Sequence, residues 1–288
     1  MFPNPLRIQA EMSHGEHIGQ CKLCRETKQL RDSHLLPRSL YKTLRAANAP
    51  NPNPIFLTST RAGQTSKQLT DYVLCGRCEG LFNANGESWM MRQIARSGTF
   101  PLQEAIKGAP HLYANANFSV HSCAGVPRID LSKLVYFALS VFWRASVHTW
   151  RVQDSQANID LGPYTEPIRK FLRGTGSFPQ NTFLIVTVTP TPEPACVVIP
   201  PVRLLPRDFH LFLFHIPGVQ FLLCTGRRVP DHFRDACIHH SPKHPIWFDE
   251  NMSGNVVERV LSNSKHSISL KKFFSMHGLP NSPNPRRR

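Results

Sequence analysis

The chain has 288 residues, and its 34 Lys and Arg outnumber its 19 Asp and Glu to give a formal net charge of +15. This length allows one large or two modest domains with buried cores. The basic excess favours a polyanionic partner, nucleic acid first, over an acidic or neutral small molecule. No apolar run is long enough to span a bilayer, and the first residues lack the apolar segment of a secretory signal. We therefore expect a cytoplasmic protein without a membrane partner.

Sequence patterns in the N-terminal part predict a polar leader, a tight turn with a short strand, a short helix, extended structure and a longer helix. In chain order these cover residues 1–18, 21–34, 39–47, 55–75 and 79–95. The short helix is expected to end at the segment 48–54, because its prolines lack backbone donors and disfavour helical geometry in the residue before them.

A segment rich in Gly, Pro and Asn, residues 98–128, precedes a change of pattern, and we place a domain boundary at residue 125. Apolar residues at helical spacing predict a long buried helix over 130–150, and Thr165 is the expected N-cap of a shorter helix. The remaining patterns predict three stretches of strand, two helices and a disordered basic tail. These cover 181–190, 195–202, 209–226 with a Pro-Gly hairpin turn, 256–264, 269–278 and 281–288.

Two CxxC pairs, Cys21/Cys24 and Cys75/Cys78, are the strongest signal in the chain. Without a secretory signal, a metal site is favoured over disulfides, and four thiolates suit tetrahedral zinc. The alternative is a set of unrelated buried or redox cysteines. Four-cysteine coordination leaves no open position for water, so this zinc is expected to be structural. The isolated cysteines are expected to be buried apolar side chains: Cys123, Cys196, Cys224 and Cys237.

The motifs follow a fixed order along the chain, formed by Cys21, Cys24, His34 with Pro37, Leu74, Cys75 and Cys78. This order resembles that of the HNH nucleases, also called His-Me finger or ββα-metal nucleases, over residues 18–92. More narrowly, the stretches SHLLPRSLYK, LCGRCE and the later FALSVFWR are similar to a group of bacterial HNH-like proteins. We therefore expect an α+β protein with a zinc-stabilised treble-clef (ββα-metal, HNH-like) nuclease domain over 1–125. An α+β recognition or regulatory domain with a mainly antiparallel sheet and a basic tail is expected over 126–288.

The resemblance implies that His34 is the general base that activates water against a phosphodiester, while a divalent ion neutralises the scissile phosphate. An imidazole that titrates near neutrality can accept this proton, and a hard Lewis acid can stabilise the developing charge. The alternative interpretation is that His34 is a loop histidine with a structural hydrogen bond.

The sequence departs from the family pattern at both positions that concern the catalytic metal. Ser33 precedes the histidine where an acid or histidine is common, although Asp32 is one residue further back, and Glu79 follows the last cysteine where histidine is common. Glu79, Asn83 and Glu87 recur at i, i+4 and i+8, near one face of a helix. Their oxygens are candidate ligands for Mg²⁺ or Mn²⁺.

These metal-site candidates have alternatives. Asn85 replaces Asn83 if the helix begins late. Glu79 alternatively sits at a helix N-terminus, where a carboxylate meets the positive end of the dipole. Glu87 alternatively is a solvated helix charge.

Two other groups of residues are further candidates for binding sites. The segment 235–250 groups Cys237, His239, His240, His244 and Asp249, for which a polar surface loop is favoured over a second metal site. A phosphate-binding surface, with scattered solvated charges as the alternative, would use Arg203, Arg207, Arg227, Arg228, Lys271 and Lys272. Trp143 and Trp150 are expected to be core anchors rather than base-stacking platforms.

The leading hypothesis is a metal-dependent HNH-like endonuclease that hydrolyses phosphodiester bonds of DNA, with structural Zn²⁺ and catalytic Mg²⁺ or Mn²⁺. Bacterial proteins of this type suggest a restriction or phage-defence effector, which is an argument from analogy. The alternative hypothesis is a non-catalytic zinc-containing nucleic-acid-binding protein. Homo-oligomerisation and an activating partner protein stay open.

Overall fold

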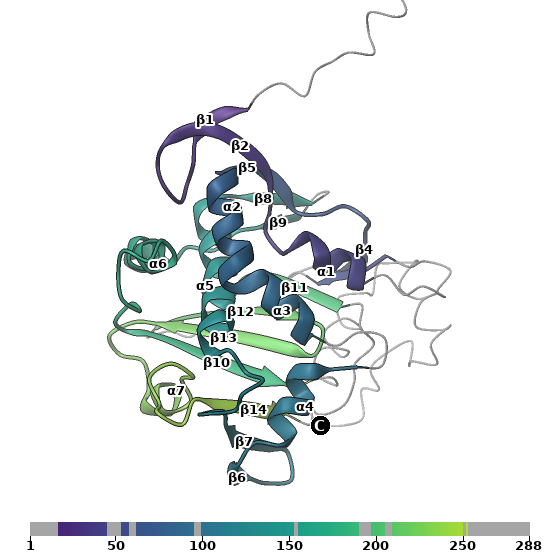
Figure 1. Cartoon of the computed structure of the whole chain (residues 1–288), viewed down its shortest axis with the longest axis vertical. Helices are drawn as coiled ribbons and strands as arrows, with labels where there is room; N and C mark the ends of the chain where they lie inside the picture. The colour runs from purple at the N-terminus through teal and green to yellow at the C-terminus, as the bar shows by residue number, and fades with distance from the viewer. Residues whose placement is uncertain are drawn as a thin grey trace, which may run out of the picture.

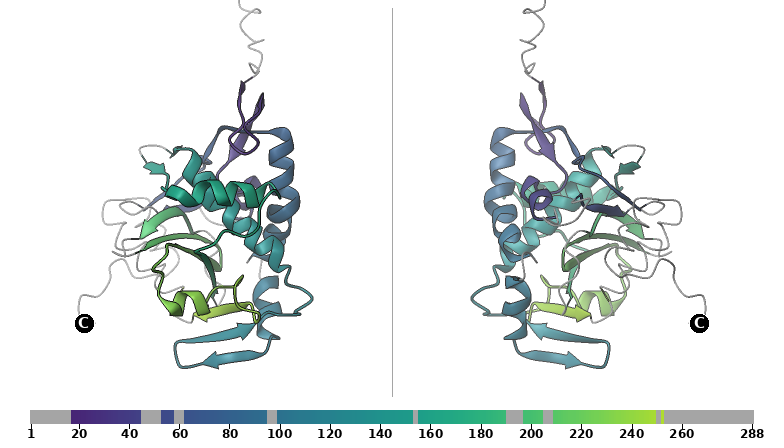
Figure 2. Two further views of the ribbon diagram at one scale, coloured as in Figure 1. Left: turned by 90° about the vertical axis from the view of Figure 1, so that its left-hand side faces the viewer. Right: turned by 90° about the vertical axis from the view of Figure 1, so that its right-hand side faces the viewer.

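The architecture is a large sheet with the long helix and its neighbours on one face, a short helix over residues 231–235 on the other face, and a small three-stranded sheet at one end (Figures 1 and 2). The computed structural model describes residues 17–44, 53–57, 62–94, 99–152, 155–189, 197–204, 209–249 and 252. The fold is of the α+β class, as expected, and its large sheet is mostly antiparallel.

The small sheet has the strand order β1-β2-β5 and carries the first cysteine pair at its turn. Both of its strand pairs are antiparallel, and a bulge between Arg31 and Asp32 shifts the register of β2 against β5. Helical segments follow β2 and β5. The bounds are β1 Ile18–Gln20, β2 Thr27–His34, α1 Arg38–Thr43, β5 Thr70–Cys75, α2 Gly76–Phe82, the π-helical segment η2 Asn83–Glu87, and α3 Ser88–Gln93.

The large sheet has nine strands in the order β4-β3-β11-β12-β13-β10-β14-β7-β6. Only two of its strand pairs, β11 with β3 and β10 with β14, are parallel in the part of the chain that is described. The bounds are β3 Ile55–Leu57, β4 Ala62–Gln64, β6 His111–Ala114, β7 Phe118–Ser122, β10 Thr182–Val188, β11 Val197–Leu204, β12 His210–Ile216, β13 Val219–Thr225 and β14 Pro245–Asp249. Strands from both sides of residue 125 therefore pair in one sheet, and the domain boundary placed there stays a prediction.

The remaining elements cover the sheet or connect its strands. Their bounds are α4 Pro101–Lys107, α5 Leu131–Val147, β8 Trp150–Val152, β9 Ser155–Ala157, the 3₁₀ turn η3 Gly162–Tyr164, α6 Thr165–Leu172 and α7 Asp231–Asp235. The long helix and the Pro-Gly hairpin between β12 and β13 are confirmed, and Gly218 adopts the positive φ of +76° that this turn requires. The predicted helices over 256–264 and 269–278 and the tail over 281–288 lie outside the described residues.

The prediction that Thr165 caps a helix is wrong by one residue. The 3₁₀ turn η3 runs directly into α6, so Tyr164 takes the N-cap position and Thr165 is the first helical residue. Cys123, Cys224 and Cys237 are fully buried, as expected, and Cys196 lies outside the described residues.

Helix α5 is the centre of the hydrophobic core. Almost every side chain from Leu134 to Ala145 is buried, and Phe137 packs edge-on against Phe214 and Phe221 of the large sheet. Each large apolar side chain buried in this way contributes about 1.5–3 kcal/mol. Trp143 and Trp150 are fully buried, which confirms them as core anchors.

The helical stretch after β5 is held against α5 by a glycine. The backbone of η2 makes the wider i to i+5 turn, with the amide of Ser88 bonded to the carbonyl of Asn83. At Gly86, a Cβ would lie 2.9 Å from the backbone nitrogen and Cα of Phe137, so only glycine allows this approach. The π-helical turn and Gly86 together let η2 lie close against α5.

Candidate metal centre and candidate active-site pocket

The four cysteines of the two CxxC pairs form a cluster in which all sulfur atoms lie within 4.8 Å of one another. The turn of the first pair is closed by the amide of Arg25, which bonds to the carbonyl of Cys21, and Arg25 itself has a φ of +66°. The amide of Cys75 donates to the sulfur of Cys21 at 3.4 Å. This four-sulfur donor set can bind a metal such as zinc.

The thiols of the cluster share protons unequally. A hydrogen bond from the Cys78 thiol lowers the pKa of Cys21 to about 4, and the same interaction raises the pKa of Cys78. Burial raises the pKa of Cys24. Because a metal ion takes the place of these protons when thiolates bind it, metal binding at the cluster is expected to release protons.

Helix α6 braces the cysteine turn from the second half of the chain. Arg169 donates to the backbone carbonyl of Leu23, within the first CxxC pair, at 2.6 Å. The same guanidinium is bound by Glu166, which also pairs with Arg25. The turn is therefore fixed by contacts that join residues more than one hundred positions apart, which the sequence analysis did not find.

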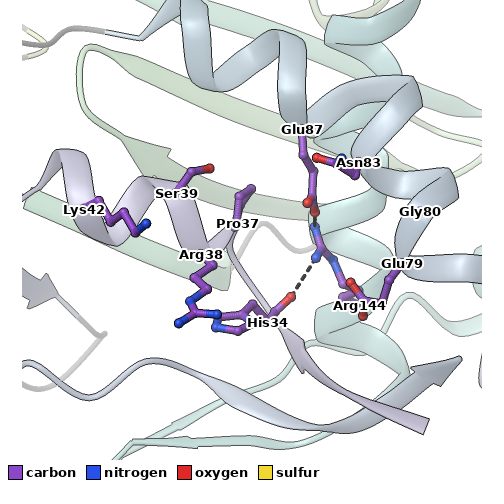
Figure 3. Close-up of a pocket in the computed structure, with 10 residues that line it drawn as sticks. All are labelled: His34, Pro37, Arg38, Ser39, Lys42, Glu79, Gly80, Asn83, Glu87 and Arg144. Atoms are coloured by element: carbon purple, nitrogen blue, oxygen red, sulfur yellow. Dashed lines mark hydrogen bonds and ion pairs between the residues drawn. The ribbon is translucent and has the colours of Figure 1, made fainter. Parts of the chain in front are cut away.

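A pocket of about 600 Å³ opens beside the end of β2. It brings together all four candidate catalytic residues named from the sequence, with cationic side chains from α1 and α5 (Figure 3). Its lining residues are His34, Pro37, Arg38, Ser39, Lys42, Glu79, Gly80, Asn83, Glu87 and Arg144. The shared location follows the sequence argument, and the catalytic roles of these residues stay predictions.

The three candidate ligands share one face even though the helix changes its pitch. Glu79 lies in the first turn of α2, while Asn83 and Glu87 begin and end the π-helical segment. Asn85 lines a different cavity together with Tyr136, so the alternative that replaced Asn83 by Asn85 is wrong.

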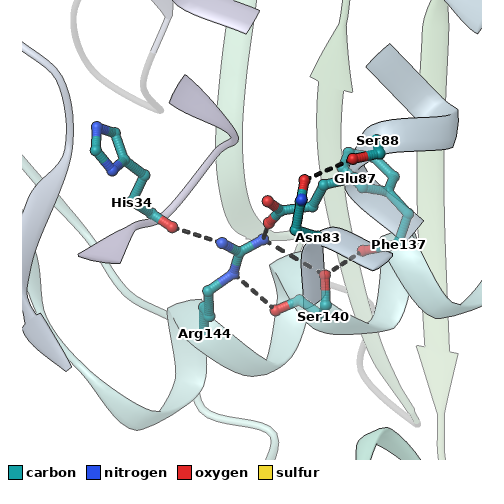
Figure 4. A network of polar contacts seen from close by, with 7 residues as sticks. All are labelled: His34, Asn83, Glu87, Ser88, Phe137, Ser140 and Arg144. Atoms are coloured by element: carbon teal, nitrogen blue, oxygen red, sulfur yellow. Dashed lines mark hydrogen bonds and ion pairs between the residues drawn. The ribbon is translucent and has the colours of Figure 1, made fainter. Parts of the chain in front are cut away.

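Arg144 of α5 connects two of the candidates through one guanidinium group (Figure 4). Its Nη1 donates to the backbone carbonyl of His34 at 2.6 Å, and its Nη2 pairs with Oε1 of Glu87 at 2.6 Å. Further bonds reach the carbonyl and hydroxyl of Ser140. The Arg144 side chain is 1% exposed and that of Glu87 is 12% exposed, so the interpretation of Glu87 as a solvated charge is wrong.

The described residues do not form an assembled site for a hard cation in this pocket. Glu87 is paired with Arg144, and the amide oxygen of Asn83 accepts a bond from the Ser88 hydroxyl at 2.7 Å. The imidazole of His34 extends away from the guanidinium (Figure 4). In the described part of the chain, the cysteine cluster is the group in which three or more His, Cys, Asp or Glu ligand atoms gather. The expected Mg²⁺ or Mn²⁺ therefore has no ready-made ligand set.

Ser33 supports the small sheet through its hydroxyl. It is fully buried, and its hydroxyl accepts a bond from the amide of Leu74 at 3.0 Å and donates to the carbonyl of Arg31. Asp32 is exposed on the opposite side of β2. The residue that departs from the family pattern thus secures β2 against β5 across the bulge.

Glu79 is half-buried, and its buried Oε1 has no hydrogen-bond partner among the described residues. Burial raises its pKa, an effect that the Ser33 hydroxyl and Arg144 oppose. Because the pKa is raised in the folded state, the charged form destabilises the fold above the ordinary pKa of a glutamate. This penalty is relieved as the pH falls through the raised pKa.

We therefore expect Glu79→Gln to raise the melting temperature of the zinc-loaded protein at pH 8 by about 2–4 °C, which corresponds to about 1 kcal/mol for a chain of this size. The gain should be smaller at pH 5 than at pH 8, because the native glutamate takes up its proton as the pH falls through its raised pKa. Thermal unfolding at both pH values measures this, with the exposed Glu104→Gln as control. A lower melting temperature at pH 8 would contradict the assignment.

The histidines of the segment 235–250 interact with neighbours instead of gathering around a metal. His239 stacks on Phe178 with ring centroids 3.9 Å apart, and burial lowers its pKa. His240 contacts the carbonyl of Thr182, and His244 that of Ile238. These contacts favour the interpretation as a polar surface loop over a second metal site.

The proposed phosphate-binding surface is described only in part. Arg203 contacts His210 at 3.0 Å, and the carbonyl of Arg227 accepts a bond from Arg234. Arg207, Lys271 and Lys272 lie outside the described residues. The surface therefore stays a prediction.

No family model matches the sequence, and no curated protein or solved structure is significantly similar to it. Within the described residues, none of the helices combines the length and apolar character needed to cross a membrane.

Proposed function

We propose that this chain is an HNH-like endonuclease that hydrolyses phosphodiester bonds of DNA. The observation that supports it best is the placement of His34. It stands at the end of β2, in an antiparallel pair with β5 that leads directly into α2, and the four-cysteine cluster lies at the other end of this pair. His34 and the α2 carboxylate Glu79 line the same pocket. The HNH resemblance predicts this order, in which a strand ends in a histidine and a later CxxC pair opens a helix.

The pocket supplies groups suited to hydrolysis of a phosphodiester. The His34 imidazole accepts a proton from water, whose oxygen then attacks phosphorus as the bond to the leaving oxygen breaks. Arg38 and Lys42 are exposed on α1 at the pocket, and no described residue forms an ion pair with either. We expect them to bind the phosphates of a nucleic-acid backbone.

Zn²⁺ at the four cysteines is proposed to be structural. Mg²⁺ or Mn²⁺, which the resemblance implies, would neutralise the scissile phosphate, but the described residues do not assemble a ligand set for it. A restriction or phage-defence role rests on the resemblance alone, and an activating partner protein or self-association is compatible with it.

The test is cleavage by the zinc-loaded chain of supercoiled plasmid, linear duplex DNA and RNA, with Mg²⁺, with Mn²⁺ and without added divalent ion. Nicking or linearisation of the plasmid is the expected result. Binding of all these nucleic acids with a steep dependence on salt, but without cleavage of any, would favour the alternative of a non-catalytic zinc-containing nucleic-acid-binding protein.

A further inference from the structure

Arg144 is held rigidly at the floor of the candidate pocket. Besides its bonds to His34, Glu87 and Ser140, its guanidinium lies over the ring of Phe82, with 5.2 Å between the guanidinium carbon and the ring centroid. Its own backbone carbonyl accepts a bond from the indole of Trp150 at 3.0 Å. A planar group with donors in fixed directions is suited to such a fixed junction, whereas a lysine could not make these bonds together.

The bond to His34 acts on the backbone, so it fixes the point where β2 ends. The next residues, Leu35 and Leu36, are fully buried, and Pro37 leads into α1. With its carbonyl held by Arg144 and its neighbours packed in the core, His34 has little freedom except in its own side chain. The backbone of His34 is therefore fixed, and only the rotation of its side chain sets the direction of the imidazole.

The bond to Glu87 has a different consequence. Because the Glu87 carboxylate is paired with Arg144, it is not available to bind a metal ion in the pocket. A divalent cation placed on this carboxylate would approach the guanidinium and leave it with a weakened partner in a buried site. The guanidinium of Arg144 is thus already the cationic partner of Glu87. Glu79 keeps an oxygen without a described partner, in contrast to Glu87.

We propose that Arg144 is a positioning residue, which holds His34 and η2 in register through Glu87, and that Glu87 is not a metal ligand. This proposal rests on the proposed nuclease function. It also makes α5, which follows residue 125, a structural part of the pocket.

The first experiment compares Arg144→Lys with Arg151→Lys, an exposed arginine on β8. Arg144→Lys is expected to lower kcat for plasmid cleavage roughly 10- to 100-fold, as small displacements of a base do. The KM for DNA and its salt dependence should stay unchanged because Arg144 is buried. A raised KM with a shallower salt dependence would overturn the proposal, since Arg144 would then contact phosphate.

The second experiment addresses Glu87 without any need for catalysis. Binding of Mn²⁺ to the zinc-loaded protein is measured by electron paramagnetic resonance for the native chain, Glu87→Gln and the control Glu104→Gln. Equal binding by all three, or none by any, is the expected result. A loss of more than about 10-fold in Mn²⁺ affinity for Glu87→Gln alone would make Glu87 a ligand and overturn the proposal.

The third measurement keeps the proposal testable if the chain cleaves nothing. The NMR resonances of the His34 ring, labelled in histidine, should move in both Arg144→Lys and Glu87→Gln, and the double variant should move no further than Arg144→Lys. Unchanged resonances in well-folded variants would show that Arg144 does not position His34. Absent cleavage with these shifts would refute the nuclease function while leaving the positioning role intact.

Discussion

Removal of the metal from the four-cysteine cluster is expected to unfold the β1-β2-β5 sheet and to destabilise the whole chain. The sheet has only three strands, and β1 has only 3 residues. Structural zinc sites contribute apparent binding energies of about 10–16 kcal/mol in zinc-finger peptides, so loss of the ion outweighs any other single contact here.

The experiment uses a chelator on the native protein and, separately, Cys78→Ser. Zinc content should fall from one ion per chain to none, the melting temperature should drop sharply, and the amides of β2 should lose protection from hydrogen exchange. Cys123→Ala is the matched control, because it removes a fully buried thiol outside the cluster and should retain zinc. A metal-free protein with the native melting temperature and full protection of β2 would refute a structural role.

His34→Ala is expected to lower the rate of cleavage by about 10²–10⁴-fold, the usual contribution of a general base. Zinc content and melting temperature should barely change. The reason is that Arg144 binds the backbone carbonyl of His34, which alanine also provides, so the polar network survives the substitution.

The control for this prediction is His232→Ala, an exposed histidine of α7 that lies outside the pocket. Cleavage by His34→Ala at the native rate, with native zinc content, would leave His34 as a loop histidine with a structural role. Partial recovery of activity when imidazole is added to His34→Ala would support proton transfer at this position.

The features that could be predicted from the sequence are those set by local spacing. Two CxxC pairs predict a cysteine cluster whatever path the chain between them takes. The i, i+4, i+8 spacing of Glu79, Asn83 and Glu87 predicts that they lie together, and they line one pocket even though the helix changes to a π-helical turn. The long helix is likewise predicted by the periodicity of its apolar residues, and the hairpin at Gly218 by its Pro-Gly turn. Each of these signals needs only neighbouring residues.

The features that escaped prediction depend on contacts between distant segments. The bond from Arg144 to His34 spans 110 positions, and no spacing rule connects them. One signal was available: Arg144 is the only charged residue between Leu134 and Val147, and an arginine in such an apolar helix requires a buried partner. Its partner could not be named, because the close approach at Gly86 that brings Glu87 to α5 is a property of packing.

The strand order of the nine-stranded sheet determines whether one half of this chain could be transferred to another protein without the other half. Strands β3 and β4 lie at one edge, β6 and β7 at the other, and the strands between them all come from after residue 125. The turn of the first CxxC pair is bonded to Arg169 of α6, and His34 in the pocket is bonded to Arg144 of α5. Two domains that are joined only by a linker can be recombined with other domains. In this chain, residues from both halves share one sheet and the same contacts, so the pocket could be transferred to another protein only together with α5 and α6.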